Sequence, residues 1–457
     1  MRRHHAPLSL AALLLLLVPL ASLACRRAAE RPPLVLLISV DTLRRDALRA
    51  FDPNAPPHPH LDAFAAESAR LERAVAAASW TLPSHGSMLT GLYPPRHGAT
   101  DPRVALASDV ATLAERFRAG GFETIGITQG GYLDRRYGFG RGFDAYADAP
   151  PANATVADAE RSVFDQAASA IAARKDARPL FLFLQTFSVH DYFRLQPWAL
   201  AMLAAKPPRP AHEYAECLQG ARLCDPADWS LLREIYAAEV RNLDAGFGRL
   251  RAALEAAGLW QTSVIVLTSD HGEGFAPELA RIHHGGRLHE DLVRVPLLAH
   301  GPGIAAREVA TPASLVDVAP TLRALAGLEP PADVDGRSLA ALLRGGDDHA
   351  AARPLFAFEH YESWVLGARI RSETVASRPL SLAVIDGDRW YLRTGRREWL
   401  YDVAADPHQE HDLGAAGPEV AALRALGDAQ DVGRTETALV ESGPDLQERL
   451  RALGYAQ

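Results

Sequence analysis

Residues 34–41 read Leu-Val-Leu-Leu-Ile-Ser-Val-Asp, a continuous apolar run that ends in a carboxylate. The run does not alternate between apolar and polar residues, which is typical of a strand buried on both faces of a parallel sheet. Residues 181–184 and 264–267 are runs of the same kind. We therefore expect parallel strands with helices packed on both faces of their sheet.

The rest of the chain supports this architecture. Between residues 236 and 254, apolar side chains recur at steps of three and four, which places them on one stripe of a helix that Gly258 can terminate. The sequence predicts an α/β sandwich with a mostly parallel central sheet over residues 33–350. Short strand candidates at 355–358, 381–385 and 390–393 predict a small antiparallel sheet subdomain over 351–413. We expect residues 414–457 to form a helical tail.

The N-terminus has the order of a secretory signal. A basic start is followed by an apolar stretch at 10–20 and by small residues at 21–24. The apolar stretch is short for a transmembrane anchor, which is the alternative. Cys25 stands where a lipoprotein signal carries its acylated cysteine, although Ser22 replaces the usual Leu, so plain cleavage and a lipid that attaches Cys25 to a membrane both stay open. We expect residues 1–25 to be a signal peptide and the chain to be exported, either to the periplasm or as a membrane-anchored lipoprotein facing outside the cytoplasm.

Charge and cysteine content narrow the choice of partners. The net charge is −8 with the charges interspersed, and no basic face is apparent, which argues against nucleic acid as a partner. Cys217 and Cys224 are close enough in sequence to form a local disulfide in an oxidising compartment. The pair offers too few ligands for a metal site.

Two of the buried runs end in carboxylates. Asp41 follows the first run, and Asp270 with His271 follows the third. Ligands of open parallel sheets bind beyond the carboxyl ends of the strands, so these side chains are expected to meet at one edge. Two carboxylates and one imidazole suit a divalent cation such as Ca²⁺, Mn²⁺, Mg²⁺ or Zn²⁺. Each Asp taken alone is equally compatible with a helix cap.

A threonine before a predicted helix is the candidate nucleophile. Thr81 precedes a helix that has Pro83 in its first turn. A helix N-terminus presents amides and positive potential to an anion, and an alkoxide that also binds a metal is attainable near neutral pH. For an isolated Thr-x-Pro, the alternative is a simple N-cap.

Six spaced motifs resemble the sulfatase family of the alkaline phosphatase superfamily. They lie at residues 41–44, 81–98, 268–273, 284–296, 335–339 and 400–407. The resemblance covers nearly everything after the N-terminal signal and implies an alkaline-phosphatase-like fold. It also implies one divalent metal ion held by Asp41, Asp270 and His271, with the oxygen of Thr81 as a further ligand.

The resemblance extends to residues around the nucleophile. His190 matches the family histidine that contacts the transferred group or the leaving oxygen. His85 is the last residue of the five-residue motif that begins with the nucleophile position, Thr81. His284 and Arg287 lie in the motif that lines the opposite wall. Gln129 stands where the family carries the lysine of a sulfate clamp. We take His85 and His190 as catalytic candidates, and His284, Arg287 and Gln129 as substrate-binding candidates.

The chain departs from strict sulfatases at several of these positions. Strict sulfatases carry Cys or Ser followed by x-Pro-x-Arg and convert the nucleophile to formylglycine, whereas Thr81 cannot be converted and His85 replaces the Arg. A sulfated Thr is hard to hydrolyse, while a phosphorylated Thr is a familiar intermediate, so the sequence leans toward phosphoryl chemistry. Thr42 replaces the second Asp of the metal pair. Gly248 stands where two-metal phosphodiesterases place a His after Asp244, which argues against a second metal.

The sequence therefore predicts a metal-dependent hydrolase that cleaves sulfate or phosphate esters through Thr81. One alternative is a transferase of phosphoglycerol or phosphoethanolamine groups onto an envelope glycan, although such relatives usually carry several transmembrane helices. The other is a surface binding protein that keeps the fold without turnover.

Overall fold

The structure is a computed structural model. It describes residues 31–148, 156–194, 197–203, 209–210, 213, 224–276, 281–346, 353–360, 379–430, 438–441 and 443–452. The expected signal peptide, Cys25 and Cys217 lie outside these residues, and Cys224 is disulfide-bonded. Within the described ranges, no helix has the length and apolar character needed to cross a bilayer.

The centre of the molecule is an eight-stranded sheet in the order β12-β2-β11-β8-β1-β7-β5-β6. Its strands are β1 (Leu34–Val40), β2 (Ala69–Leu71), β5 (Glu123–Ile127), β6 (Ala145–Ala147), β7 (Leu180–Thr186), β8 (Val264–Ser269), β11 (Leu297–His300) and β12 (Arg307–Val309). Strand β1 lies between β7 and β8 and is parallel to both, whereas β11 runs antiparallel to β8 and β2. The predicted mostly parallel α/β sheet is confirmed.

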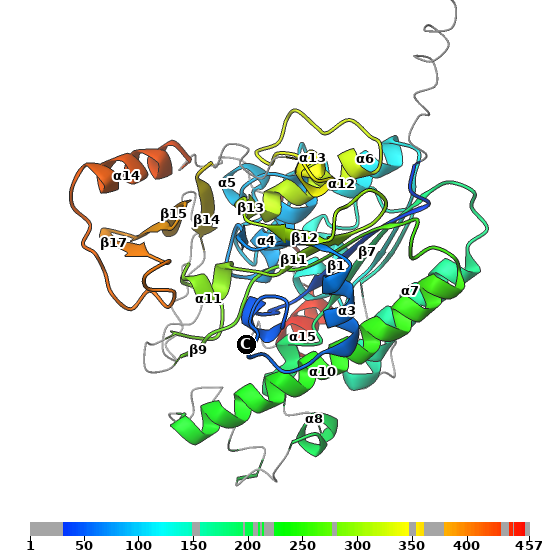
Figure 1. Ribbon diagram of the computed structural model, residues 1–457, viewed down its shortest axis with the longest axis horizontal. Coiled ribbons are helices and arrows are strands. Elements are labelled where there is room, and N and C mark those ends of the chain that lie inside the picture. The colour runs from blue at the N-terminus through cyan, green and yellow to red at the C-terminus, as the bar shows by residue number, and fades with distance from the viewer. Residues whose placement is uncertain are drawn as a thin grey trace, which may run out of the picture.

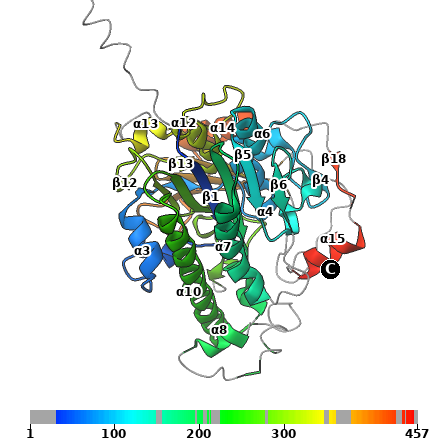
Figure 2. The same cartoon turned by 90° about the vertical axis from the view of Figure 1, so that its right-hand side faces the viewer.

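Both faces of β1 are buried, as its unbroken apolar run predicts. Val35 and Leu37 belong to one hydrophobic cluster, while Leu36 and Ile38 belong to another on the opposite face. The first cluster includes side chains of α4 (Thr81–Thr90), α6 (Leu113–Ala119) and α12 (Val318–Leu325). The second includes side chains of α3 (Pro59–Ala66), α7 (Val156–Ala173) and α10 (Pro226–Ala256). Figures 1 and 2 show these two helix layers on either side of the sheet.

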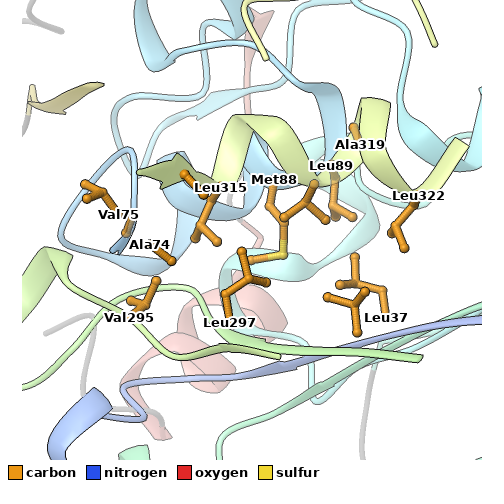
Figure 3. Close-up of a cluster of buried hydrophobic side chains, with 14 of the residues drawn as sticks. Leu37, Ala74, Val75, Met88, Leu89, Val295, Leu297, Leu315, Ala319 and Leu322 are labelled. Atoms are coloured by element: carbon orange, nitrogen blue, oxygen red, sulfur yellow. The ribbon is translucent and has the colours of Figure 1, made fainter. Parts of the chain in front are cut away.

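Helix α4 is held rigidly against the sheet. Every one of its residues is buried. Figure 3 shows Met88 and Leu89 of α4 pointing toward the sheet, where Leu37 and Leu297 lie, with Leu322 of α12 nearby. Full burial of such side chains contributes about 1.5–3 kcal/mol each. This packing fixes the position of the N-terminus of α4, where Thr81 lies.

The helix predicted from the apolar stripe at 236–254 is longer than expected. Helix α10 begins at Pro226, because Asp225 and Asp228 form a capping box and the proline occupies the first turn. It ends at Ala256, and Gly258 then adopts a left-handed conformation with φ of 68°.

The predicted second sheet is also present. It is antiparallel and contains β14 (Leu355–Glu359), β15 (Ser381–Asp386), β16 (Arg389–Thr394) and β17 (Arg397–Asp402). Helix α14 (Pro418–Gln430) packs Val420 and Leu423 against it. Strand β17 is not among the predicted strands, and its last three residues belong to the motif at 400–407.

The C-terminal part is less purely helical than predicted. Strand β18 (Ala438–Leu439) pairs with β4 (Val104–Ala105), and α15 (Pro444–Ala452) places Leu446 and Leu450 in the core of the large domain. The end of the chain is therefore anchored to the α/β domain.

The remaining elements are short. They are η1 (Arg45–Ala47), β3 (Ala74–Val75), α5 (Pro94–His97), η2 (Gly131–Leu133), η3 (Arg135–Tyr137), η4 (His190–Arg194), α8 (Pro197–Ala201), β9 (Phe275–Ala276), β10 (Arg281–Ile282), α11 (Glu290–Val293), β13 (Ala313–Ser314), η6 (Leu315–Asp317) and α13 (Ala340–Leu343).

Candidate active site

The turn after β1 brings three strand ends together. The amide of Asp41 donates to the carbonyl of Thr186 at the end of β7, over 2.9 Å. Thr42 adopts a left-handed conformation with φ of 56°, and its amide donates to Asp270 Oδ1 after β8, over 3.3 Å. The hydroxyl of Tyr236 on α10 donates to the Thr42 carbonyl over 2.8 Å, which stabilises this unusual backbone.

The turn after β8 is equally constrained. The amide of His271 donates to Asp270 Oδ1 over 2.9 Å. A Cβ on Gly272 would lie 2.0 Å from the carbonyl oxygen of Asp291, so only glycine fits there. The positions of Asp270 and His271 are therefore set by backbone contacts as well as by the strand.

Three ligand atoms converge at this edge, and none of them has a hydrogen-bond partner among the residues that the structure describes. Asp41, Asp270 and His271 are all 0% exposed, and within the described part of the chain no hydrogen bond is made by Asp41 Oδ1, Asp270 Oδ2 or His271 Nε2. His271 Nε2 lies 3.7 Å from Asp41 Oδ1 and 3.4 Å from Asp270 Oδ2. A ligand atom from each of the three residues falls within 4.8 Å of the others. Because buried polar atoms are rarely left unpaired, this geometry indicates a missing common partner.

The electrostatics of the three residues favour a cation as that partner. Burial, and then the neighbouring carboxylate of Asp270, raise the pKa of Asp41 well above its usual value. Burial also raises the pKa of Asp270. Burial, and then His284, lower the pKa of His271 to about 3, so the imidazole is neutral and has a lone pair to offer. Two carboxylate oxygens and one neutral imidazole fit a divalent metal ion.

Thr81 lies beside this candidate metal centre. It is the first residue of α4, and the N-cap residue Trp80 makes no side-chain capping bond. The Thr81 hydroxyl donates to Asp41 Oδ2 over 3.1 Å. One oxygen of the Asp41 carboxylate, Oδ2, accepts this hydrogen bond, while the other, Oδ1, is one of the three atoms of the candidate metal centre. Asp41 therefore connects Thr81 to that centre.

His85 is fully buried behind the metal centre. Its Nε2 lies 2.9 Å from Ser39 Oγ, and its Nδ1 lies 2.9 Å from the Thr81 carbonyl and 3.3 Å from Asp270 Oδ2. Burial lowers the pKa of His85 despite the adjacent Asp270, so the ring is neutral. The structure thus places His85 in contact with the Asp270 carboxylate and the backbone of Thr81.

Two further histidines stand close to the metal centre. The ring centroid of His284 lies 4.7 Å from that of His271 and 5.3 Å from that of His190. His284 Nδ1 lies 3.0 Å from Glu273 Oε2, and although burial alone would raise it, the adjacent histidines lower the pKa of Glu273 to about 2. Glu273 is therefore an acceptor only, and His284 Nδ1 is the donor. His190 Nδ1 lies 3.4 Å from Asp191 Oδ1.

The other two predicted substrate contacts have partners inside the protein. Arg287 forms a two-pronged ion pair with Asp291, at 2.6 and 2.9 Å. Gln129 Oε1 accepts a hydrogen bond from the amide of Phe187. The predicted contacts of Arg287 and Gln129 with substrate stay predictions.

Sequence reasoning missed Ser39 and Glu273 as members of the site. Ser39 is the one polar residue inside the apolar run of β1, and that exception was a usable signal. Glu273 lies three residues after Asp270 in the same motif, but its pairing with His284 depends on the fold.

Comparisons with known proteins agree with this geometry. The Sulfatase family model matches residues 33–328. The steryl-sulfatase of Mus musculus is 30% identical over 427 residues, covering 73% of this chain and 68% of that protein. Arylsulfatase A of Homo sapiens is 26% identical over 501 residues, covering 93% and 92%. The phosphonate monoester hydrolase of Agrobacterium radiobacter shares the fold with a TM-score of 0.70, at 21% identity over 88% of this chain and 94% of that one.

The family match spans more than half of the chain and includes the β1, α4 and β8 segments that form the site. The resemblance inferred from the six motifs is therefore confirmed. This chain belongs to the Sulfatase family of sulfuric ester hydrolases, within the alkaline phosphatase superfamily.

Proposed function

We propose that this enzyme is a metal-assisted hydrolase with Thr81 as its nucleophile, and that phosphate and phosphonate monoesters are better substrates than sulfate esters. The observation that carries the proposal is the Thr81 hydroxyl, 3.1 Å from Asp41 Oδ2 and beside three unpaired, fully buried ligand atoms. A Thr placed only as an N-cap would direct its oxygen to the amides of its own helix, and here Trp80 is the N-cap.

The residues divide the chemistry between them. A divalent cation held by Asp41, Asp270 and His271 would supply Lewis-acid polarisation of the ester and favour the ionised hydroxyl. Asp41 orients the Thr81 oxygen through its hydrogen bond. The amide end of α4 favours the negative charge of the transferred group.

The proposed reaction has two steps. Thr81 passes its hydroxyl proton to Asp41 Oδ2, and its Oγ1 forms a bond to phosphorus while the bond to the leaving oxygen breaks. His190 donates a proton to that leaving oxygen, and recovers one from the water that attacks in the second step. His284, oriented by Glu273, stabilises charge on the transferred group. Water then cleaves the Thr81 ester, releasing the free acid and restoring the hydroxyl.

The preference for phosphorus follows from the nucleophile. A formylglycine hydrate expels sulfate by collapsing to an aldehyde. An esterified threonine has no second hydroxyl on the same carbon, so it cannot release its sulfate or phosphate group in this way. Water must attack the esterified Thr81 directly, which is accessible for a phosphoryl group and hard for a sulfuryl group. A phosphonate monoester hydrolase and a sulfatase both share this fold, so the fold is compatible with phosphorus esters as well as sulfate esters.

The test compares four aryl esters with one enzyme preparation: a sulfate, a phosphate monoester, a phosphonate monoester and a phosphodiester. The protein is metal-stripped and then resupplied with Ca²⁺, Mn²⁺, Mg²⁺ or Zn²⁺ in turn. Thr81→Ala is the test variant, and Thr90→Ala, at the other end of the same buried helix, is the matched control. We expect metal-dependent cleavage of phosphorus esters that Thr81→Ala abolishes and Thr90→Ala retains.

Two results would overturn the proposal. Cleavage of the sulfate alone would mean that another route releases a sulfated Thr81, and full activity of Thr81→Ala would remove the nucleophile. Product analysis with excess acceptor alcohol separates hydrolysis from the transferase alternative, because a transferase yields the new ester instead of free acid.

We also propose that the enzyme acts outside the cytoplasm. The order of basic, apolar and small residues at 1–25 supports export, and the disulfide at Cys224 is typical of an oxidising compartment. Mass spectrometry of the mature N-terminal peptide tests this, and a diacylglycerol adduct on Cys25 would identify a lipoprotein.

A further inference from the structure

One buried carboxylate links the small sheet to the active site. Glu359, the last residue of β14, is 1% exposed. Its Oε2 accepts from Ser79 Oγ over 2.9 Å, and its Oε1 accepts from Trp80 Nε1 over 3.0 Å. Ser79 and Trp80 are the two residues immediately before Thr81.

The same carboxylate holds the opposite wall of the site. Glu359 Oε2 also accepts from the amide of Gly286, over 3.1 Å. Gly285 and Gly286 both have left-handed backbones, with φ of 78° and 71°, and they directly follow His284. The amide of Gly285 donates to the Ser79 carbonyl over 2.8 Å, so the two segments also contact each other directly.

Strand β14 is itself attached to the nucleophile segment. The amide of Phe358 donates to the Ala77 carbonyl over 2.9 Å. Glu359 therefore cannot move without shifting residues 77–80, and a buried carboxylate with three donors is strongly localised.

We propose that Glu359 is a positioning residue that sets the distance and orientation between Thr81 and His284. The proposal rests on Thr81 being the nucleophile, and it goes further by making the small sheet part of the catalytic apparatus. The hydrogen bonds of Glu359 to Ser79, Trp80 and Gly286 connect it to the residues beside Thr81 and His284, and its influence on the site passes through them.

The expected effect is on turnover more than on substrate affinity. A displacement of about 1 Å at a catalytic group costs on the order of a hundredfold in rate. Glu359→Gln keeps the size of the side chain but turns one oxygen into an NH₂ group that faces a donor. We therefore expect Glu359→Gln to lower kcat by roughly tenfold to a hundredfold, which is the range for a misplaced catalytic group, and to change KM by less than about threefold.

The experiment measures kcat, KM and thermal stability for Glu359→Gln, Ser79→Ala and Trp80→Phe. Each of the latter two removes one donor to Glu359, and both should lower kcat in the same direction by a smaller factor. Combining either with Glu359→Gln should cost less than the product of the single effects, because all three variants break one network. These weaker variants keep the test meaningful if Glu359→Gln fails to fold.

The matched control is Asp317→Asn, which weakens another fully buried carboxylate with backbone and arginine partners outside the site. Assays are made well below the melting temperature of every variant. The proposal is overturned if Glu359→Gln keeps kcat within twofold of wild type, or if Asp317→Asn lowers kcat as much. A failure of the proposed nucleophile has a different signature, because Thr81→Ala would then retain activity whatever Glu359→Gln does.

Discussion

Two sets of buried carboxylates in this molecule look alike in sequence and differ in what surrounds them. Asp41 and Asp270 at the edge of the large sheet, and Asp317 beneath the small sheet, are all 0% exposed. Asp317 accepts from the amides of Ser314 and Arg337, at 2.9 and 2.7 Å, and pairs with the guanidinium of Arg353. Asp41 and Asp270 each retain one oxygen that accepts no hydrogen bond from any described residue.

The comparison separates a structural carboxylate from a ligand-binding one. Burial raises the pKa of all three groups, so neither depth nor pKa direction distinguishes them. What distinguishes Asp41 and Asp270 from Asp317 is that each has an oxygen without a hydrogen bond from the described residues, close to His271 Nε2, which has none either. A satisfied carboxylate holds its neighbours together, whereas an unsatisfied pair needs a cation to complete it.

The largest expected effect comes from removing one charge at the sheet edge. Asp270→Asn should lower kcat at least a thousandfold, equivalent to about 4 kcal/mol of barrier, because the metal loses an anionic ligand. Steady-state kinetics on the best ester substrate measures it. The metal-free variant should be no less stable than the metal-free wild type, since a repulsive buried pair has been relieved. If the Asp270→Asn variant were stable and fully active, Asp270 would not be a required ligand of the metal.

The opposite pattern is expected at Asp317. Asp317→Asn should lower the free energy of unfolding by about 3 kcal/mol, because Arg353 loses its buried counter-ion. Activity per folded molecule should stay within twofold of wild type. Denaturant unfolding with kinetics on the same samples checks both statements, and loss of activity without loss of stability would contradict the assignment.

Metal removal should distinguish the two regions directly. A chelator should lower the stability of the wild type by about 2.7 kcal/mol when the free metal had been a hundredfold above its dissociation constant. Asp317→Asn should respond by a similar amount, whereas Asp270→Asn should respond little. Melting curves with and without chelator measure the differences. Equal responses of wild type and Asp270→Asn would mean that the metal binds elsewhere.

The smallest effect concerns a buried carboxyl that has no ligand cluster around it. Glu239 on α10 is 0% exposed, and neither of its oxygens has a partner among the described residues. Burial, and then Asp191, raise its pKa to about 9. Between pH 4.5, the ordinary pKa of a glutamate, and about pH 9, Glu239 is protonated in the folded chain and ionised in the unfolded chain. The folded chain then holds one more proton, so the free energy of unfolding falls as pH rises through this window.

Glu239→Gln should therefore stabilise the protein at pH 8 by about 1–2 kcal/mol and have little effect at pH 5. Urea unfolding at the two pH values measures the difference. An equal change at both would show that Glu239 is not protonated in the folded state. The contrast with Asp41 sharpens the comparison, because burial leaves Glu239 to be neutralised by a proton, whereas a cation is the partner proposed for Asp41 and Asp270.

The fold was largely predictable because its signals are local. The unbroken apolar run predicted β1 at its observed bounds, 34–40, and the runs near 181 and 264 predicted its neighbours β7 and β8. Helix α10 was predicted too short because its first turns carry a capping signal, Asp225-Pro226, in place of a regular stripe.

The site was predictable only in part, because some partners come from distant segments. Asp41, Asp270 and His271 followed from strand ends that share one sheet edge. The contacts of His85 with Ser39 and Asp270 could not be read from spacing, and Glu359 is 280 residues from Ser79. The ion pair of Arg287 with Asp291, four residues later, was not predicted from the sequence, and the contact of Arg287 with substrate stays a prediction.

The central place of β1 has a consequence for how the enzyme acquires its structure. This strand is complete at residue 40, whereas its two neighbours end at residues 186 and 269. The backbone N–H and C=O groups of β1 stay unpaired until those later segments are available, and such non-local pairing slows folding. The catalytic edge thus assembles late, and premature exposure of β1 is the step at which misfolding and aggregation would compete.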